Sequence, residues 1–380
     1  MGHSPSTAIN ASGRCQAIET RAWKESWKSD KDRPTATHSS RHELLRDVLK
    51  QVSRSFYLTL TVLPSNVRGQ VGLSYLFARA VDTIADTDLI DRSRRLFYLQ
   101  QFRHQFSEDA IHWDEVRSIQ TSLLPHQTHS SERVLLTRLE DCFRLYQEYT
   151  VEDRQRIRTL MSTLPNGMEM DLTKFPGESA ATLTALQTTD DMDRYIYYVA
   201  GCVGEFWTGM MCAHMPSLSH WDIAHMSAIG VRFGKGLQLT NILKDLPRDL
   251  RRGRCYIPEV ILREAGLTPA DLLQKENVIR YRQVLSWLLK IAVDHLDQGW
   301  AYTMQIPRRE TRLRLSCMWP ILLAGETLKR VAISPDILDP AVNIKVPRYR
   351  VYQVMALTIL TGACGYIGAA YWGHLRKQII

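Results

Sequence analysis

Two pairs of aspartates stand out in this chain of 380 residues because of their spacing. Asp82 and Asp86 are four residues apart, and so are Asp245 and Asp249. On a helix, this spacing places both carboxylates of a pair on one face, where they repel each other unless a cation lies between them. Carboxylate oxygens are hard ligands that suit Mg²⁺ shared with a phosphate. The two pairs therefore predict a site at which metal ions hold a diphosphate.

The first pair belongs to a polar stripe on an otherwise apolar segment. Tyr75, Arg79, Asp82 and Asp86 recur at helical steps, which gives one face a ring, a guanidinium and two carboxylates. A solvated helix face with an ion pair between Arg79 and Asp82 would show the same pattern, and for one isolated pair that interpretation is favoured. The metal-site prediction therefore depends on the second pair as well.

The second pair has amide side chains beside it. Gln238, Asn241 and Asp245 share one helical stripe, and the amide oxygen of Asn241 can add a neutral metal ligand. Pro247 lies between Asp245 and Asp249, and a proline inside a helix removes one hydrogen bond and clashes with the carbonyl four residues earlier. We therefore expect Asp249 to lie less securely on the metal-binding face.

Helices must position these groups. From about His42 onward, Leu, Ala, Arg and Gln recur at helical spacing without the alternation of strands, and prolines divide the chain into segments of ordinary helix length. We predict an all-α domain. Residues 230–236 superficially resemble a Walker loop, but the stretch is one residue short and Gly236 stands where Ser or Thr should bind Mg²⁺. That difference excludes nucleotide hydrolysis.

The composition is that of a globular protein with a large core, at 44% hydrophobic and 23% charged residues. The net charge of +8 would suit an anionic substrate, lipid or nucleic acid, but no arginine cluster with interleaved aromatic residues occurs, so we predict no nucleic-acid partner. The seven cysteines form no CxxC pair and support neither a zinc site nor a disulfide framework. A reducing, cytoplasmic compartment is expected.

The two ends of the chain differ from its middle. Residues 1–41 are rich in Ser, Thr, His and charge, which predicts a disordered tail without a signal peptide. Residues 351–373 contain no Asp, Glu, Lys or Arg and are long enough to span a bilayer, although polar residues and glycines dilute their hydrophobicity. We predict a domain at 42–355 and a hydrophobic helix at 356–380. That helix either contacts a membrane, peripherally or as an anchor, or packs against the domain.

Five segments in sequence resemble the successive motifs of the squalene/phytoene synthase family. They are Ser53-Arg54-Ser55-Phe56 and residues 75–86, 195–204, 237–249 and 253–258. The resemblance covers residues 42–355, and the wording is closer to the squalene synthases within the family. It implies an all-α isoprenoid-synthase fold, one helical domain with a central apolar cavity between two aspartate-bearing helices.

The activity that the resemblance implies is the head-to-head joining of two farnesyl diphosphates to presqualene diphosphate, followed by reduction with NADPH to squalene. Releasing an allylic diphosphate requires cations on the leaving group, and the carbocation then requires a dry cavity with aromatic faces. The implied Mg²⁺ ligands are Asp82, Asp86, Asn241, Asp245 and Asp249. The implied diphosphate-binding residues are Ser53, Arg54, Ser55, Arg79, Lys244 and Arg254.

Two tyrosines are catalytic candidates by the same resemblance. Tyr195 matches a family tyrosine assigned to the first half-reaction, although a tyrosine that only packs between helices would look the same in the sequence. Tyr75 offers a ring face to a carbocation. Residues 167–171 also resemble a family segment that lines the cavity, and they receive no chemical role. The candidate NADPH-binding residues are Arg54, Arg79, Gln238, Lys244, Lys345 and Arg348.

Three departures from the family pattern bear on these assignments. Ala85 replaces an acidic residue before Asp86, Lys244 replaces an arginine and loses its bidentate geometry, and Arg348 is displaced by one position from the family arginine. Two alternatives stay open. One is a synthase that does not reduce its product and gives phytoene, dehydrosqualene or presqualene diphosphate. The other is a noncatalytic helical assembly or binding protein. We expect a monomer.

Overall fold

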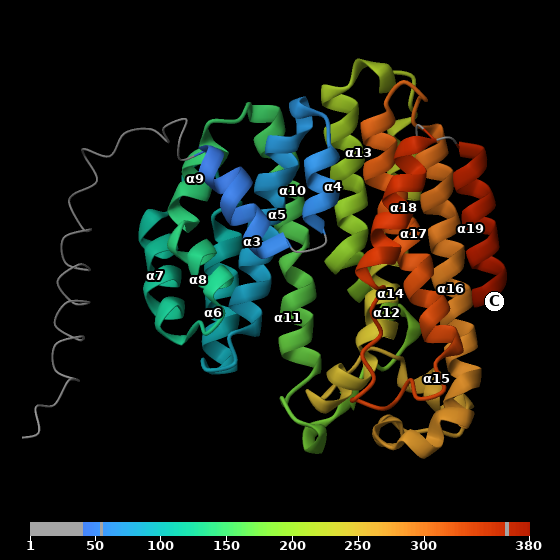
Figure 1. The fold of residues 1–380 in the computed structure, drawn as a ribbon. Helices are drawn as coiled ribbons and strands as arrows, with labels where there is room; N and C mark the ends of the chain where they lie inside the picture. The colour runs from blue at the N-terminus through green and yellow to red at the C-terminus, as the bar shows by residue number, and fades with distance from the viewer. Residues whose placement is uncertain (1–40, 54–55, 362–364) are drawn as a thin grey trace, which may run out of the picture.

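A computed structural model describes residues 41–53, 56–361 and 365–380, and helices account for most of them (Figure 1). The predicted tail lies outside this part of the chain, except for residue 41. The first half contains η1 (Glu43–Val48), α3 (Leu49–Ser53), α4 (Phe56–Val62), α5 (Ser65–Asp86), α6 (Arg92–His104), α7 (Trp113–Leu123), η2 (Leu124–His126), α8 (Ser130–Thr137), α9 (Leu139–Gln147), α10 (Val151–Thr163) and α11 (Pro165–Lys174).

The second half contains η3 (Ala180–Thr182), β1 (Thr184–Ala185), α12 (Thr189–Ile196), η4 (Tyr197–Gly201), α13 (Cys202–His214), η5 (Pro216–Leu218), α14 (Ile223–Arg251), β2 (Arg254–Cys255), α15 (Glu259–Glu264), η6 (Pro269–Leu273), η7 (Lys275–Asn277), α16 (Val278–Gln305), α17 (Thr311–Ile333), α18 (Arg348–Leu360) and α19 (Gly365–Ile379). In the described residues, β1 and β2 form a single short parallel pair, so the predicted all-α class is confirmed.

The helices surround two hydrophobic cores, one built mainly by the first half of the chain and one mainly by the second. Figure 1 shows α5 to α11 gathered on one side and α14 to α19 on the other, with α13 between them. The two predicted aspartate helices are α5 and α14. The aspartate-bearing stretches of α5 and α14 therefore pack in different cores.

Large aromatic side chains hold α5 in place. The helix begins directly after Pro64, and its residue Phe77 is completely buried. The Phe77 ring lies 4.8 to 6.1 Å, centroid to centroid, from the rings of Phe102, Phe106, Phe143 and Tyr146. Aromatic pairs at these distances add to the stabilisation from buried area. The apolar face of α5 is thus fixed, and its polar face is left to carry Asp82 and Asp86.

Close backbone contacts hold α14 in place. A side chain added at Gly204 on α13 would overlap the backbone of Gly230, and one added at Gly234 would overlap the carbonyl of Ala200. These glycines let α14 approach α13 and η4 more closely than any residue with a Cβ would allow. The family-like glycine Gly204 therefore serves helix packing.

The N-terminus of α14 is capped by Asp222, whose carboxylate accepts from the His225 backbone N–H at 3.2 Å.

The helix α14 also continues through Pro247, which lies in its interior. Pro247 is buried, and its carbonyl accepts from Arg251 Nη1 at 3.0 Å. Packing around the proline offsets the lost hydrogen bond, so the helix ends at Arg251 and includes Asp249.

The C-terminal segment is two helices, and the expected boundary at residue 355 falls inside α18. Trp319 Nε1 on α17 donates to Thr358 Oγ1 on α18 at 2.8 Å, and Trp372 Nε1 on α19 donates to Asp297 Oδ1 on α16 at 2.8 Å. Both helices therefore pack against the domain. Among the described residues, no helix combines the length and the apolar character needed to cross a bilayer.

Candidate active site

On α5, Asp82 lies in a network of charges. Arg79 Nη1 lies 2.9 Å from Asp82 Oδ2, and Arg79 Nη2 lies 2.8 Å from Oε1 of Glu132 on α8. Burial raises the pKa of Asp82 to about 7 in spite of Arg79, and repulsion from Asp86 adds to the effect. Asp86 is the last residue of α5, with about half of its side chain exposed. The positive charge near the carboxylates of Asp82 and Asp86 therefore does not fully compensate their negative charge.

On α14, Asp249 is a carboxylate with a perturbed pKa. Burial raises the pKa of Asp249 to about 6, and the charge of Asp245 is the next cause. Lys244 Nζ lies 3.0 Å from Asp245 Oδ2. Helix α14 runs without a break through Pro247 to Arg251, so the helix disruption from which we expected Asp249 to lie less securely on this face does not occur. The stripe also holds Asn241, whose amide donates to Gln238 Oε1 at 3.5 Å.

A third carboxylate, Asp171 on α11, lies beside two buried tyrosines. Its Oδ2 accepts from the Tyr256 hydroxyl at 3.0 Å and from the Tyr195 hydroxyl at 3.5 Å, and Arg254 Nη1 lies 3.5 Å away. Its Oδ1 is buried and has no hydrogen-bond partner among the described residues. A buried carboxylate oxygen without a partner is unusual and indicates a place for a ligand or a proton.

Asp171 also connects the two aspartate helices. Burial raises its pKa to about 7 against the opposing effect of Arg254, and the charges of Asp86 on α5 and Asp249 on α14 raise it further. Arg254 Nη1 lies 3.8 Å from Asp86 Oδ1. Asp171 and Arg254 therefore lie close to one aspartate of each pair, Asp86 on α5 and Asp249 on α14.

The short strand pair positions the residues around Asp171. In β2, Arg254 pairs with Thr184 of β1, and Tyr256 follows directly. The turn before β2 contains Gly253 at φ 79°, a conformation that favours glycine. The ring of Tyr256 stacks on that of Tyr195, with centroids 4.6 Å apart. Burial raises the pKa of both tyrosines well above the ordinary value, so both hydroxyls remain protonated hydrogen-bond donors.

An apolar pocket of about 640 Å³, including space open to solvent, lies along α14. Its walls include Val203, Trp207, Phe233, Leu237 and Tyr302, and its exposed surface is almost entirely apolar. The predicted cavity therefore exists, but its lining residues come from α4, η4, α13, α14, α16 and α17 and not from α5.

The pocket and the polar stripe of Gln238, Asn241 and Asp245 lie next to each other along α14. Leu237 lines the pocket, Gln238 is the next residue, and Asn241 and Asp245 follow at one-turn intervals. A molecule with a charged head and a long apolar chain would meet both surfaces at once. The apolar pocket and the polar stripe that follows it on α14 are therefore the main chemical features of the site.

The remaining predicted residues are distributed differently. Ser53 is buried at the end of α3, where its hydroxyl donates to the Leu49 carbonyl, and Tyr75 is half-buried on α5, one turn before Arg79. Arg54 and Ser55 lie outside the described residues. Lys345 and Arg348 are exposed, before and at the start of α18, and no hydrogen bond or ion pair joins them to the described site residues. Within the described residues, Lys345 and Arg348 are thus not joined to the other candidate NADPH-binding residues by direct contacts.

Three participants are missing from the sequence-based site. Asp171 ends the family-like segment at 167–171, and Tyr256 lies in the motif at 253–258. Both segments are identifiable in the sequence, but neither residue is assigned a chemical role from it. Glu132 lies on α8, 53 residues from its partner Arg79, and no sequence signal connects the two. The contacts of all three are tertiary.

The donor set fits Mg²⁺. The carboxylates of Asp82, Asp86, Asp245 and Asp249 and the amide oxygen of Asn241 are hard oxygen ligands, the kind that Mg²⁺ prefers. Burial raises the pKa of Asp82 and Asp249, which shows that the nearby Arg and Lys do not fully compensate these carboxylates. A divalent cation would supply that compensation.

The model of one protein family, described as squalene/phytoene synthase, matches residues 49–350. The chain belongs to this family. Its members are prenyltransferases of the head-to-head type, and the relatives of this chain carry both names. A squalene synthase of Cyberlindnera jadinii is 26% identical over 84% of this chain and 68% of its own length. A 15-cis-phytoene synthase of Synechocystis is 25% identical over 92% of this chain and 88% of its own length.

One relative is longer than this chain by a large margin. The bifunctional lycopene cyclase/phytoene synthase of Arthroderma gypseum is 31% identical over 60% of this chain, but the match spans only 36% of that protein. Matches to several yeast squalene synthases span 63–71% of their lengths. The chain thus spans from about a third to about two thirds of these curated relatives.

Solved structures share the fold. The TcSQS complex with BPH1237 has a TM-score of 0.69 at 21% identity and covers 90% of this chain and 97% of its own. A dehydrosqualene synthase has a TM-score of 0.57 at 21% identity and covers 85% of this chain and 96% of its own. The predicted isoprenoid-synthase fold and family are therefore confirmed.

Proposed function

We propose that this chain joins two farnesyl diphosphates head to head to give presqualene diphosphate and reduces it with NADPH to squalene. The observation that carries the condensation is the meeting of two aspartate pairs and Asp171 beside an apolar pocket on α14. The reductive step has weaker support, because Lys345 and Arg348 make no direct contact with the described site residues.

The diphosphate would be held at the acidic end of the site. Bound at the aspartates of α5 and α14, Mg²⁺ would neutralise the leaving diphosphate. Arg79, Lys244 and Arg254 lie within the same network of charges and would bind phosphate oxygens once the metal satisfies the carboxylates. Developing negative charge on the leaving group would meet cations that are already in position.

The prenyl chains would occupy the apolar pocket. Its walls expose almost no polar surface, so a carbocation there would meet few polar groups that could capture it. The rings of Trp207, Phe233 and Tyr302 line this space and can stabilise positive charge through their faces. The sequence assigned this role to Tyr75, which lies one turn before Arg79 on α5 and stays a candidate.

Proton removal would take place at Asp171. A carboxylate whose pKa is about 7 can accept a proton near neutral pH and release it again. The hydroxyls of Tyr195 and Tyr256 hold its Oδ2 and leave Oδ1 open. Tyr195 would then act by orienting the base, because its own pKa is too high for it to serve as a base.

The alternative is a synthase of the same condensation without reduction, which gives phytoene, dehydrosqualene or presqualene diphosphate. The matches to phytoene synthases over most of this chain support this non-reducing alternative. A noncatalytic role has less support, since all four aspartates of the pairs are present together with the pocket.

Product analysis tests the proposal. Purified full-length chain is incubated with Mg²⁺ and either farnesyl or geranylgeranyl diphosphate, each with and without NADPH, and the products are identified by mass spectrometry. We expect squalene from farnesyl diphosphate only when NADPH is present. The same product with and without NADPH would favour the non-reducing synthase, and no condensation with either substrate would contradict the enzymatic assignment.

We further propose that the chain is a cytoplasmic monomer that touches membranes peripherally through α18 and α19. Leu360 and Tyr366 lie on these two helices near their junction, and their side chains are 86% and 84% exposed. Exposed apolar side chains of this size favour the membrane interface. Co-sedimentation with lipid vesicles should weaken in a Leu360→Ser, Tyr366→Ser variant, and light scattering should give a monomer mass.

A further inference from the structure

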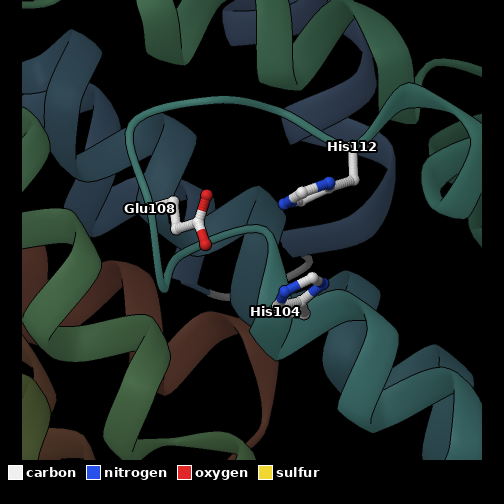
Figure 2. Close-up of side chains that lie close together, drawn as sticks. All are labelled: His104, Glu108 and His112. Atoms are coloured by element: carbon white, nitrogen blue, oxygen red, sulfur yellow. The ribbon is translucent and has the colours of Figure 1, made fainter.

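A second group of ligand-type side chains lies outside the aspartate site, where α6 leads into α7. His104 ends α6, Glu108 lies in the connecting turn, and His112 directly precedes α7. Each offers one ligand atom, and these atoms all lie within 4.8 Å of one another. Figure 2 shows the two imidazole rings one above the other, with the Glu108 carboxylate to one side of both. The turn thus brings three good metal ligands together.

Glu115 fixes the orientation of His104. The Nδ1 atom of His104 lies 3.1 and 3.0 Å from the two carboxylate oxygens of Glu115. A carboxylate accepts hydrogen bonds, so Nδ1 carries the proton and Nε2 keeps its lone pair. Metal-binding histidines commonly donate their second ring N–H to a carboxylate in this way, which fixes the ring and raises its basicity.

His112 provides an observation, independent of the ligand distances, that points to a bound ligand. Its Nε2 is buried and has no hydrogen-bond partner among the described residues. Its ring stacks on that of His104, with centroids 4.3 Å apart and an angle of 12° between the planes. A buried ring nitrogen usually has a partner, so the free Nε2 requires an explanation.

The turn is held in place without a metal. Gln105 Oε1 accepts from the His112 backbone N–H at 2.8 Å, and Gln105 Nε2 donates to Glu115 Oε2 at 2.6 Å. Arg158 on α10 donates to the Glu108 carbonyl at 3.0 Å. Because the backbone is already fixed, little conformational entropy would be lost when a ligand binds.

We propose that His104 Nε2, His112 Nε2 and a Glu108 carboxylate oxygen bind one Zn²⁺ ion, with water as the fourth ligand. Two histidines and one glutamate form a known set for tetrahedral zinc. Glu108 and the supporting Glu115 balance the charge of the ion. At Zn–ligand distances of about 2.0–2.1 Å the ligand atoms would lie about 3.4 Å apart, so the ligand atoms draw together and the rings tilt out of their stack.

The ligand types keep this site distinct from the aspartate site. The aspartate pairs offer oxygen ligands only and suit Mg²⁺, whereas imidazole nitrogen favours zinc and the later first-row metals. The ion would tie the end of α6 to the start of α7. Neither histidine belongs to the candidate catalytic residues of the aspartate site.

Zinc binding to the full-length chain tests this proposal. Titration calorimetry with Zn²⁺ is run in millimolar Mg²⁺, which occupies the aspartates, on wild type, His104→Gln, His112→Gln and Glu115→Gln. His225→Gln is the matched control, since this exposed histidine lies at the start of α14 and its side chain makes none of the contacts described above. We expect one tight site in wild type and in the control. Both His variants should lose it, and Glu115→Gln should weaken it by about 10–100-fold.

Two further readouts keep the result clear. Co²⁺ bound in place of Zn²⁺ should give the visible absorption of a four-coordinate ion in wild type and not in His112→Gln. Zn²⁺ should raise the midpoint of thermal unfolding in wild type and in His225→Gln but not in His104→Gln or His112→Gln, because it stabilises only a folded state that binds it. Equal zinc affinity in wild type and both His variants would overturn the proposal, and so would the absence of a tight site in wild type. The latter result would leave a stacked imidazole pair held by Glu115.

Discussion

The helices α5 and α14 carry the same aspartate spacing, yet the protein holds them in opposite ways. Helix α5 is fixed by the Phe77 ring among four other rings, whereas α14 is fixed by backbone contacts at Gly204, Gly230 and Gly234. The pocket explains the difference. Because α14 forms a pocket wall and also carries the proposed metal ligands, its separation from α13 matters, while α5 needs only to present its polar face.

The largest effect should follow from removing one carboxylate on either helix. Asp82→Asn and Asp245→Asn each remove a charged metal ligand at constant volume, so each should lower kcat/KM by roughly a thousandfold with little change in folding. Asp88→Asn, an exposed position just after α5, is the control and should keep wild-type activity. Steady-state kinetics with saturating Mg²⁺ measure the effect. Near-normal turnover in one variant would mean that only one helix holds the metals.

The aromatic support of α5 should respond strongly to truncation. Phe77→Ala leaves a cavity among four rings and should lower the free energy of unfolding by about 3–5 kcal/mol. Phe97→Ala on α6 is the matched control, because the Phe97 side chain is half exposed, and it should change stability by no more than about 0.5 kcal/mol. Urea denaturation distinguishes them. A small loss for Phe77→Ala would show that the rings do not determine the position of α5.

The carboxylate that connects the two helices should control the pH dependence of the reaction. If Asp171 accepts a proton, it must be ionised, so the wild-type rate should rise with pH through about 7 and then level off. Asp171→Asn should lower kcat by about a hundredfold and remove this rise. Rates measured from pH 5.5 to 8.5 with constant Mg²⁺ provide the comparison. An unchanged pH profile in the variant would assign the proton transfer elsewhere.

The close packing of α14 should tolerate no added side chain. Gly204→Ala would force the backbones of α13 and α14 apart and should destabilise the fold by about 1–3 kcal/mol. Gly209→Ala on the same helix meets only the flexible Arg156 side chain at 4.0 Å and should be neutral or stabilising. Urea denaturation and substrate KM together measure the effect. Equal stability of both variants would contradict the proposed role of the glycine contacts.

The smallest effect concerns His295 on α16, which packs against Gly236 of α14. Burial lowers the pKa of His295 to about 4, and Arg232 and Lys235 add to the effect. When the pH is lowered, the unfolded chain therefore takes up this proton first, near pH 6.5. The free energy of unfolding decreases as the pH is lowered further. His295→Gln should remove about 1 kcal/mol of the loss between pH 6.5 and pH 5.5. Parallel wild-type and variant curves would contradict this.

The fold class could be predicted because helical periodicity and proline positions are local. Pro64 lies directly before α5, Pro165 opens α11 and Pro258 precedes α15, as the punctuation of the sequence suggests. Pro247 is the exception. A local rule assigns it a helix break, but Pro247 is buried inside a continuous α14, and Asp249 therefore stays within this helix.

The sequence by itself determined the two carboxylate pairs, the amide beside the second pair and the helices that carry them, because spacing of three to four residues fixes a helix face. Tertiary structure alone decided the rest. Glu132 with Arg79, Tyr256 with Asp171, and His104 with His112 meet across turns or between helices. Their contacts and the pKa values they produce depend on distance and burial in three dimensions, which a linear pattern does not contain.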